Sequence, residues 1–574
     1  MEILTLQFGH YSNYVGSHFW NFQDELAAVQ DSRLEEDESI PLDFNRSHSQ
    51  LETQGVVRWH PRLVLVDKKG SLGVNGTDHS HAQDRDATME GFESCNMWDY
   101  QSVSIPAESF PLHAFQEDLA RESVLMNAWG DGLQQDDDIV VDEDLNPQQD
   151  SNQASTIRSS AEYDFQSTVK TWSDYSKVHL SARTVHELQG VHHDVSPFAI
   201  YFDGLSLRGG NDVETVLDLV RRQAEQSDQL DAVHTVFDMH DGFSGLASLA
   251  LNWVQEEQPK CGKFVAPIMP SLDMSAVENG SQCWSISEQT SSPSVSKVDI
   301  EACAWVSAAF SFSSLVNSGV HVCTPLAVPL WSAQKPFSMD ALRYDSLYES
   351  SSLIASALET ATLPYRLAGS LRPSRFLATM TPAHRPVCGL LQSLPLPSMH
   401  LAPTLFHQRP ENAPQYFFDL ASTPMISSNP FTSLVLRGSD PRYLVKLCES
   451  LPRQAHRSCF VHPTPLPLPI PFPQMFNKDI SSKGIICQDS PRKSGSEVEQ
   501  CPTGTVLHAA AQAGRCGALR RMLEVVKARR RSPWSTAIQA QYGVDADEFQ
   551  EVIEVVTEHL ECGAPSESED GMDS

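Results

Sequence analysis

Apolar and polar residues follow one another along this chain in the rhythm of an α/β fold. The first short apolar run, Ile3–Phe8, ends at Gly9, and apolar residues then recur at helical spacing from Val15 to Leu26. A strand that ends at a glycine and turns directly into a helix aims backbone amides at one edge of the sheet. The pattern therefore predicts the opening unit of a doubly wound parallel sheet.

Two further stretches repeat this alternation. Residues 61–67 form a continuous apolar run that ends at Asp67, which is typical of a strand buried on both faces of a parallel sheet. Between residues 213 and 268 lie a helix, a strand at Ala232–Phe237, a glycine loop, a second helix and a strand at Lys263–Ile268. Right-handed crossovers build this order into a parallel sheet.

The remaining sequence predicts a second folded unit and a long insertion. Helical apolar patterns at 302–316 and 350–362 and a strand at 433–436 indicate the second unit, and helices resume near residues 519 and 549. Residues 73–165 contain too few apolar side chains to offset their ordering entropy, apart from short helices near Phe115 and Leu125. The division is a first segment (1–72), an acidic, largely disordered insertion (73–165), a continuation of the first fold (166–300), a second α+β domain (301–460), and a C-terminal region with a proline-rich connector, helices and an acidic tail (461–574).

The proline-rich stretch at 463–473 places a proline at every second position. Alternate prolines forbid helix and remove donors for strand pairing, so the stretch must be extended. We expect a stiff connector or a strand that lies across the surface.

Composition and net charge restrict the classes of partner and of binding site that we expect for this chain. The chain has 574 residues with a formal net charge of −33, and phosphate backbones need clustered Lys and Arg, so nucleic acid is not expected as a partner. The 12 cysteines include no Cys-x-x-Cys pair, which argues against a zinc ribbon or a dithiol redox site. We find no secretory signal or matrix presequence at the start and no apolar run long enough for a membrane span, so any membrane association is expected to be peripheral.

The loop at 238–245, Asp-Met-His-Asp-Gly-Phe-Ser-Gly, is the strongest candidate for a ligand site, because it lies between a strand and a helix. Phosphate-binding loops need glycines for close backbone approach, and only Gly242 and Gly245 are present. Phe243 adds bulk and Asp241 adds negative charge, which both weaken phosphate binding. His240–Asp241 and His192–Asp194 show no spaced third ligand in the sequence, so we predict no metal site and no catalytic residue.

The opening segment resembles the amino terminus of tubulin. The matching residues, in order, are Glu2, Ile3, Leu6, Gln7, Gly9, Asn13, Gly16, Phe19 and Trp20, and the strand that ends at Asp67 also matches. The chain departs from tubulin at His10 and Tyr11, where tubulin has a polar pair that touches the nucleotide. The resemblance implies a tubulin-like doubly wound sheet, and it implies that GTP or GDP with Mg, if bound, would contact Gly9, His10, Tyr11, Asp67, Gly242, Ser244 and Gly245.

The whole pattern resembles the Misato family of tubulin-related proteins. The resemblance rests on residues 2–20, 61–72, 238–245, 344–367 and 435–438. It implies a cytoplasmic protein, peripheral on the mitochondrial outer membrane, that acts in mitochondrial distribution, morphology and fusion through protein partners. Because the loop is altered, we expect a non-enzymatic protein without a cofactor. The alternative is a GTPase of the tubulin superfamily with a role in spindle or microtubule organisation.

Overall fold

The structure is a computed structural model of the whole chain. It describes most of the segments for which the sequence predicts helices or strands. The acidic insertion falls almost entirely outside the described residues, so its predicted disorder is not addressed by the structure. The described ranges, apart from single positions and short gaps of two or three residues within them, are 1–32, 41–72, 112–130, 163–192, 198–272, 297–380, 385–397, 416–423, 431–443, 456–510 and 516–561.

A parallel sheet forms the first layer of the molecule, as the sequence predicts. Its strand order is β5-β4-β1-β6-β7-β8, with β9 also pairing with β7, and every described pairing in it is parallel. The central strand β1 therefore has β4 on one side and β6 on the other, and the chain winds outward in both directions. The strands are β1 (Glu2–Phe8), β4 (Leu63–Lys69), β5 (Val185–His192), β6 (Leu230–Asp238), β7 (Gly262–Met269), β8 (Val322–Cys323) and β9 (Leu326–Ala327).

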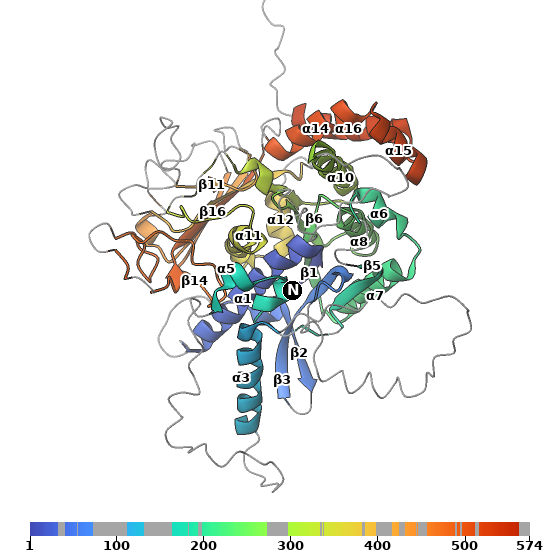
Figure 1. Cartoon of the computed structure of the whole chain (residues 1–574). Helices are drawn as coiled ribbons and strands as arrows, with labels where there is room; N and C mark the ends of the chain where they lie inside the picture. Colours follow the sequence, from blue (N-terminus) through green and yellow to red (C-terminus); the bar gives the residue numbers. More distant parts are fainter. Residues whose placement is uncertain are drawn as a thin grey trace, which may run out of the picture.

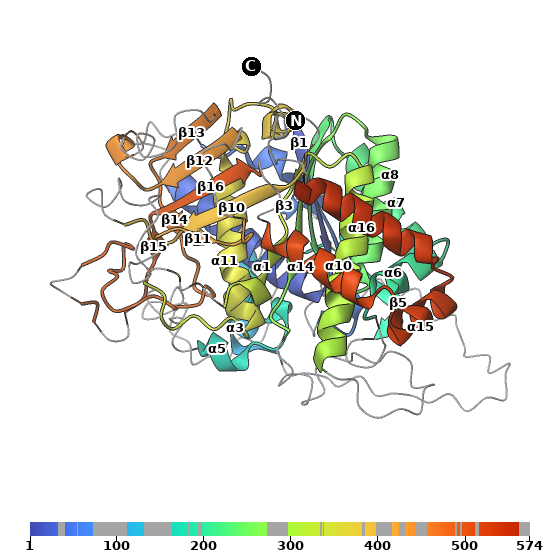
Figure 2. The ribbon, with the colours of Figure 1, turned by 90° about the horizontal axis from the view of Figure 1, so that it is seen from above.

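Helices cover both faces of this sheet, because alternate side chains of each buried strand point to opposite faces. Leu4, Leu6 and Phe8 pack with one group of helices, whereas Ile3 belongs to the core on the other face. Figure 2 shows α8 and α10 on one side of the sheet and α1 with α11 on the other. The first group is α6 (Tyr201–Ser206), α7 (Asn211–Glu225), α8 (Phe243–Glu257) and α10 (Lys297–Asn317), and the second is α1 (His10–Ser32), α11 (Leu347–Thr362) and α12 (Pro373–Met380).

A second, mixed sheet packs behind α11, so that α11 lies between the two sheets (Figure 2). Its strand order is β11-β10-β16-β12-β13, with only the β12–β13 pair parallel among the described pairings. Together with the first sheet it confirms the predicted α/β class with a further α+β unit. The strands are β10 (Cys388–Ser393), β11 (Phe418–Asp419), β12 (Phe431–Arg437), β13 (His456–His462) and β16 (Thr503–Ala509).

The proline-rich stretch is part of the core, which corrects the expectation of a connector or a surface strand. It contains β14 (Leu466–Pro467), which pairs with β15 (Gln500–Cys501). Leu466 is fully buried and Phe472 lies against Phe22 of α1, with ring centroids 5.7 Å apart. The apolar residues between the prolines are hidden because the extended backbone lays them against α1 and α11.

The remaining elements lie at the periphery. A hairpin of β2 (His48–Thr53) and β3 (Val56–Pro61) projects from the body near α3 (Ala114–Gly130), which contains both Phe115 and Leu125, where short helices are predicted (Figure 1). Residues 163–175 return to the body through α5 (Phe165–Thr168) and a 3-10 turn at Trp172–Tyr175. Three C-terminal helices cover α10, namely α14 (Gly517–Arg529), α15 (Pro533–Tyr542) and α16 (Ala546–Glu561).

Candidate functional site

The candidate residues from the first and third segments meet at the carboxyl ends of β1, β4 and β6. The chain leaves β1 toward β4 and leaves β6 toward β7, so the β1–β6 boundary is the point where the winding direction reverses. Open α/β sheets bind ligands outside the strand ends at such a point. The structure therefore brings Gly9 and Asp67 together with Asp238, which begins the 238–245 loop.

Gly9 forms the turn between β1 and α1. Its φ is +114°, which strains any other residue, and a Cβ atom there would lie 2.5 Å from the carboxylate of Asp238. Gly9 is therefore required both by backbone conformation and by the close approach of β6. The neighbour of Gly9 is a carboxylate of the chain itself, and a nucleotide contact at this glycine stays a prediction.

The carboxylate of Asp238 occupies the N-terminus of α1. It accepts hydrogen bonds from the backbone N–H groups of Tyr11, at 3.0 Å, and Ser12, at 2.7 Å. The first turn of a helix offers such N–H groups and a positive dipole end to an anion. In this chain an internal side chain takes the place that a phosphate oxygen would need. From the sequence we expected the charge of Asp241 to weaken phosphate binding, whereas Asp238 is the carboxylate that lies at this helix end. Its position directly after a buried strand was the signal for it.

Asp67 is held by a different set of donors. Its carboxylate accepts from the Nδ2 of Asn13 at 3.0 Å and from the Nε1 of Trp172 at 2.9 Å, and it lies 3.4 Å from Nδ1 of His10. Burial alone would raise the pKa of Asp67, but hydrogen bonding and charge from His10, helped by Asn13 and the Lys68 N–H, lower it to about 2. Asp67 is thus ionised and well satisfied by its own chain. Asn13 and Trp172 are contacts that the sequence analysis missed.

Gly242, Ser244 and Gly245 serve the packing of α8. The N–H of Gly242 donates to the carbonyl of Phe198, and a Cβ atom at Gly242 would lie 2.7 Å from the Phe198 ring. A Cβ atom at Gly245 would lie 2.2 Å from the carbonyl oxygen of Tyr201. The Oγ of Ser244 donates to the carbonyl of Asp241. All three residues are buried, so the loop faces the 198–206 segment.

Aromatic side chains fill the space beside the N-terminus of α1. Tyr11 is buried and its hydroxyl donates to Oγ of Ser350 on α11, at 2.9 Å. His18 stacks between Tyr175 and Tyr348, with ring centroids 4.6 and 5.3 Å away, and burial lowers its pKa to about 3. The hydroxyl of Tyr175 donates to the carbonyl of Tyr14 at 2.8 Å. These residues form a buried, close-packed layer between α1 and α11.

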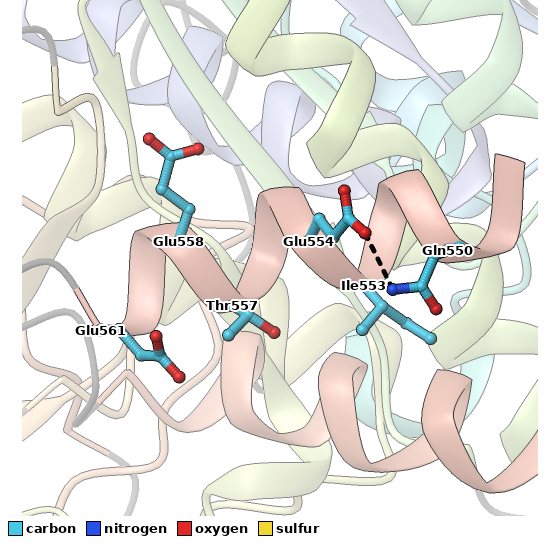
Figure 3. Close-up of a pocket in the computed structure, with 6 residues that line it drawn as sticks. All are labelled: Gln550, Ile553, Glu554, Thr557, Glu558 and Glu561. Atoms are coloured by element: carbon cyan, nitrogen blue, oxygen red, sulfur yellow. Dashed lines mark hydrogen bonds between the residues drawn. The ribbon is translucent and has the colours of Figure 1, made fainter. Parts of the chain in front are cut away.

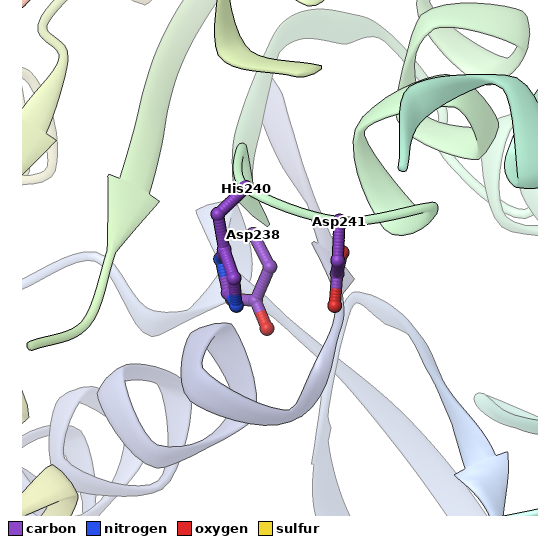
Figure 4. A group of neighbouring side chains, drawn as sticks. All are labelled: Asp238, His240 and Asp241. Atoms are coloured by element: carbon purple, nitrogen blue, oxygen red, sulfur yellow. The ribbon is translucent and has the colours of Figure 1, made fainter. Parts of the chain in front are cut away.

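The 238–241 loop carries three buried side chains that lie side by side, Asp238, His240 and Asp241 (Figure 4). Burial, together with the charge of Asp241, raises the pKa of Asp238. Burial likewise raises the pKa of Asp241, although the charge of Lys68 opposes it. Burial lowers the pKa of His240 to about 3, so its imidazole is neutral. The third partner for His240 and Asp241 that the sequence did not reveal is therefore Asp238.

A separate open hollow of about 610 Å³ lies on α16 (Figure 3). Its only internal hydrogen bond among the residues drawn joins Gln550 to Glu554, at 2.9 Å. Three glutamates make the hollow acidic, which suits a cationic segment of a protein better than a phosphate. The lining residues are Gln550, Ile553, Glu554, Thr557, Glu558 and Glu561.

Comparisons with known proteins agree with this geometry. The Misato Segment II tubulin-like domain matches residues 1–121, and the Tubulin domain matches residues 162–367. Protein misato homolog 1 of Bos taurus is 24% identical, over 98% of this chain and 97% of its own length. Protein misato of Drosophila melanogaster is 24% identical, over 99% of both chains. The chain belongs to the Misato family. Protein misato homolog 1 of Danio rerio, 25% identical over 77% of this chain, is a further relative.

Membership of the Misato family accounts for the tubulin-like sheet. The two matched regions contain β1, β4 and β6 with all the candidate residues at their ends, and they extend through α11. At the strand ends within these regions, Asp238 accepts from the first turn of α1, and the aromatic layer packs between α1 and α11. A search of the described helices finds none whose length and apolar character would let it cross a membrane.

Proposed function

We propose that this chain is a non-enzymatic, tubulin-related scaffold that acts in mitochondrial distribution, morphology and fusion through protein partners at the mitochondrial surface. The mitochondrial part of the proposal rests on membership of the Misato family. The non-enzymatic part rests on one observation, the carboxylate of Asp238 on the N–H groups of Tyr11 and Ser12. A phosphate brought to this helix end would find both N–H donors already taken by the carboxyl oxygens of Asp238.

Two further features support a scaffold without a nucleotide cofactor. The glycines of the 238–245 loop are used for contacts with Phe198 and Tyr201, so the backbone has no spare room for phosphates. The aromatic layer around His18 occupies the space between α1 and α11 with closely packed, buried rings. Closing the crevice in this way stabilises the core and leaves the outer surface, with its negative net charge, for protein partners.

A direct biochemical test is titration of the purified chain with a fluorescent GTP analogue in the presence of Mg²⁺, together with an assay for released phosphate. The scaffold proposal predicts no saturable binding and no hydrolysis above the buffer rate. Saturable binding with turnover would instead support the alternative function, a GTPase of the tubulin superfamily acting in spindle or microtubule organisation.

The cellular part is tested by depletion of the protein and rescue with variants. Ser244→Ala removes the loop hydroxyl that a phosphate would use, and Ser248→Ala, one turn later on α8, is the matched control. Both variants are expected to restore mitochondrial shape and distribution to the same extent, and the protein is expected to co-sediment with mitochondria and to be released by alkaline extraction. An unchanged mitochondrial network after depletion would contradict the proposal.

A further inference from the structure

We infer that Asp238, His240 and Asp241 form a binding site for one divalent transition-metal ion, with Zn²⁺ as the ion that the donor set fits best. Each residue offers one ligand atom, and these three atoms lie within 4.8 Å of one another. The three side chains come from one four-residue stretch at the end of β6, and Figure 4 shows them side by side. The site needs no nucleotide, so it is separate from the proposed function.

The donor set is what a transition metal requires. Zinc sites with three protein ligands combine imidazole nitrogen and carboxylate oxygen at about 2.0–2.2 Å and leave a fourth position for water. His240 contributes the one imidazole of the cluster, and imidazole in its neutral form is a common zinc ligand. One nitrogen and two oxygens favour zinc or manganese over calcium and magnesium, which take oxygen ligands. Closing the three atoms around an ion takes side-chain movements of about an ångström.

The carboxylates are already oriented by donors outside the cluster. Asp238 accepts from two N–H groups of α1, and Oδ1 of Asp241 accepts from the N–H of Phe243 at 2.9 Å. Each carboxylate oxygen can accept more than one interaction, so these hydrogen bonds leave lone pairs for an ion. Outer-shell donors of this kind orient ligands and are part of a built metal site.

The local charge also favours a cation. The carboxyl groups of Asp238, Asp241 and Asp67 are all buried, and Asp67 acts electrostatically on both of the others. The charges that face them are Lys68 from β4, which acts on Asp241, and Asp203 from α6, which adds repulsion. Buried carboxylates persist where they are paired or coordinate a metal, and a divalent ion would supply two positive charges. A shared proton is the competing way to relieve this repulsion.

The test uses the full-length chain, stripped of metal with a chelator and passed into metal-free buffer. Zinc titration by calorimetry and metal analysis after gel filtration are expected to give one Zn²⁺ per chain. His240→Gln and Asp241→Asn are each expected to weaken binding by roughly ten- to a hundredfold. His186→Gln is the matched control, since His186 also contacts a carboxylate, Asp212, but lies outside the cluster.

A second readout distinguishes this site from adventitious surface histidines. Cobalt bound in place of zinc gives visible absorption bands that depend on its ligands, and these bands are expected in the wild type and the control but not in His240→Gln. Circular dichroism in chelator shows whether each variant folds, and Asp241→Asn replaces His240→Gln if the latter does not. Failure to retain stoichiometric zinc, or zinc binding that both variants leave unchanged, would overturn the inference and favour a shared proton. Nucleotide content measured on the same sample reports on the proposed function alone.

Discussion

Two groups of buried carboxylates, Glu359 on α11 and the Asp238–Asp241 pair after β6, have pKa values shifted in opposite directions. Burial alone would raise the pKa of Glu359 on α11, but the charges of Arg437 and Arg366 outweigh it and lower that pKa. At the end of β6, burial and mutual repulsion raise the pKa values of Asp238 and Asp241. The first group is a structural link between α11 and β12, and the second is a place where the fold tolerates unbalanced charge. Such imbalance is a mark of sites rather than of scaffolding.

The two groups respond to pH with opposite signs. A carboxylate with a lowered pKa stabilises the fold above its unfolded pKa, and that stability is lost as the pH falls. A carboxylate with a raised pKa contributes stability that is fully present below its unfolded pKa and is lost as the pH rises through the folded value. The Glu359 cluster is therefore weakened by acid, whereas the Asp238–Asp241 cluster is weakened toward neutral pH.

Glu359→Gln tests the balanced group and is expected to have the largest effect. The change leaves the guanidinium groups of Arg366 and Arg437 buried without their carboxylate, which costs about 3–5 kcal/mol of unfolding free energy. Denaturant unfolding followed by circular dichroism measures the loss. A midpoint equal to that of the wild type would show that the link between α11 and β12 is dispensable.

Trp172→Phe tests one of the hydrogen-bond donors to Asp67. These donors distinguish Asp67, whose pKa is lowered, from Asp238 and Asp241, whose pKa values are raised. The variant keeps an aromatic ring but removes the Nε1–H bond to the Asp67 carboxylate, which is expected to cost about 1.5–3 kcal/mol. Trp59→Phe is the matched control, because Trp59 on β3 is 45% exposed. Equal melting temperatures for the two variants would mean that Asp67 does not depend on Trp172.

Asp241→Asn tests whether the raised pKa of Asp241 destabilises the fold as the pH rises. Asn can still accept from the Phe243 N–H, but it removes a carboxyl whose pKa is raised to about 7 from about 4. In chelator, the variant is expected to gain stability relative to the wild type as the pH rises from about 4 to about 7, because each unit of pKa shift is worth about 1.4 kcal/mol. Melting temperatures across this range measure the difference, and a pH-independent difference would contradict the account.

Arg442→Gln removes an exposed ion pair, for comparison with the buried ion pairs of Glu359, and is expected to have the smallest effect on stability. Arg442 pairs with Asp440, and the Arg442 side chain is 82% exposed while that of Asp440 is 34% exposed. Because water and salt screen such pairs, no measurable shift in the unfolding midpoint is expected. A shift as large as that of Glu359→Gln would mean that burial does not set the strength of these ion pairs.

Local patterns made the first sheet predictable. The apolar run before Gly9 predicts β1, and the apolar run before Asp67 predicts β4. The alternation of strand and helix patterns also predicts the loop after β6. The second sheet was harder, because β16 pairs with β10 and β12, which lie far away in the sequence. No local pattern distinguishes a strand that is completed by such distant partners.

The position of the site at the strand ends was predictable from the sequence, but the contacts that its residues make were not. Sequence reasoning placed Gly242 and Gly245 at a phosphate loop, whereas they permit contacts with Phe198 and Tyr201 that only the fold reveals. The hydrogen bond from Trp172 to Asp67 joins residues 105 positions apart, with the whole acidic insertion between them in the sequence. Asp238 could have been weighed with Asp67, since both are acids at the end of a buried parallel strand.

The central claim is that Asp238 replaces a phosphate at the N-terminus of α1. The most direct measurement is the nucleotide content of the purified, full-length chain after denaturation, determined by anion-exchange chromatography against GDP and GTP standards. The account predicts far less than one mole of guanine nucleotide per mole of protein. Release of about one mole of GDP or GTP per chain would contradict it.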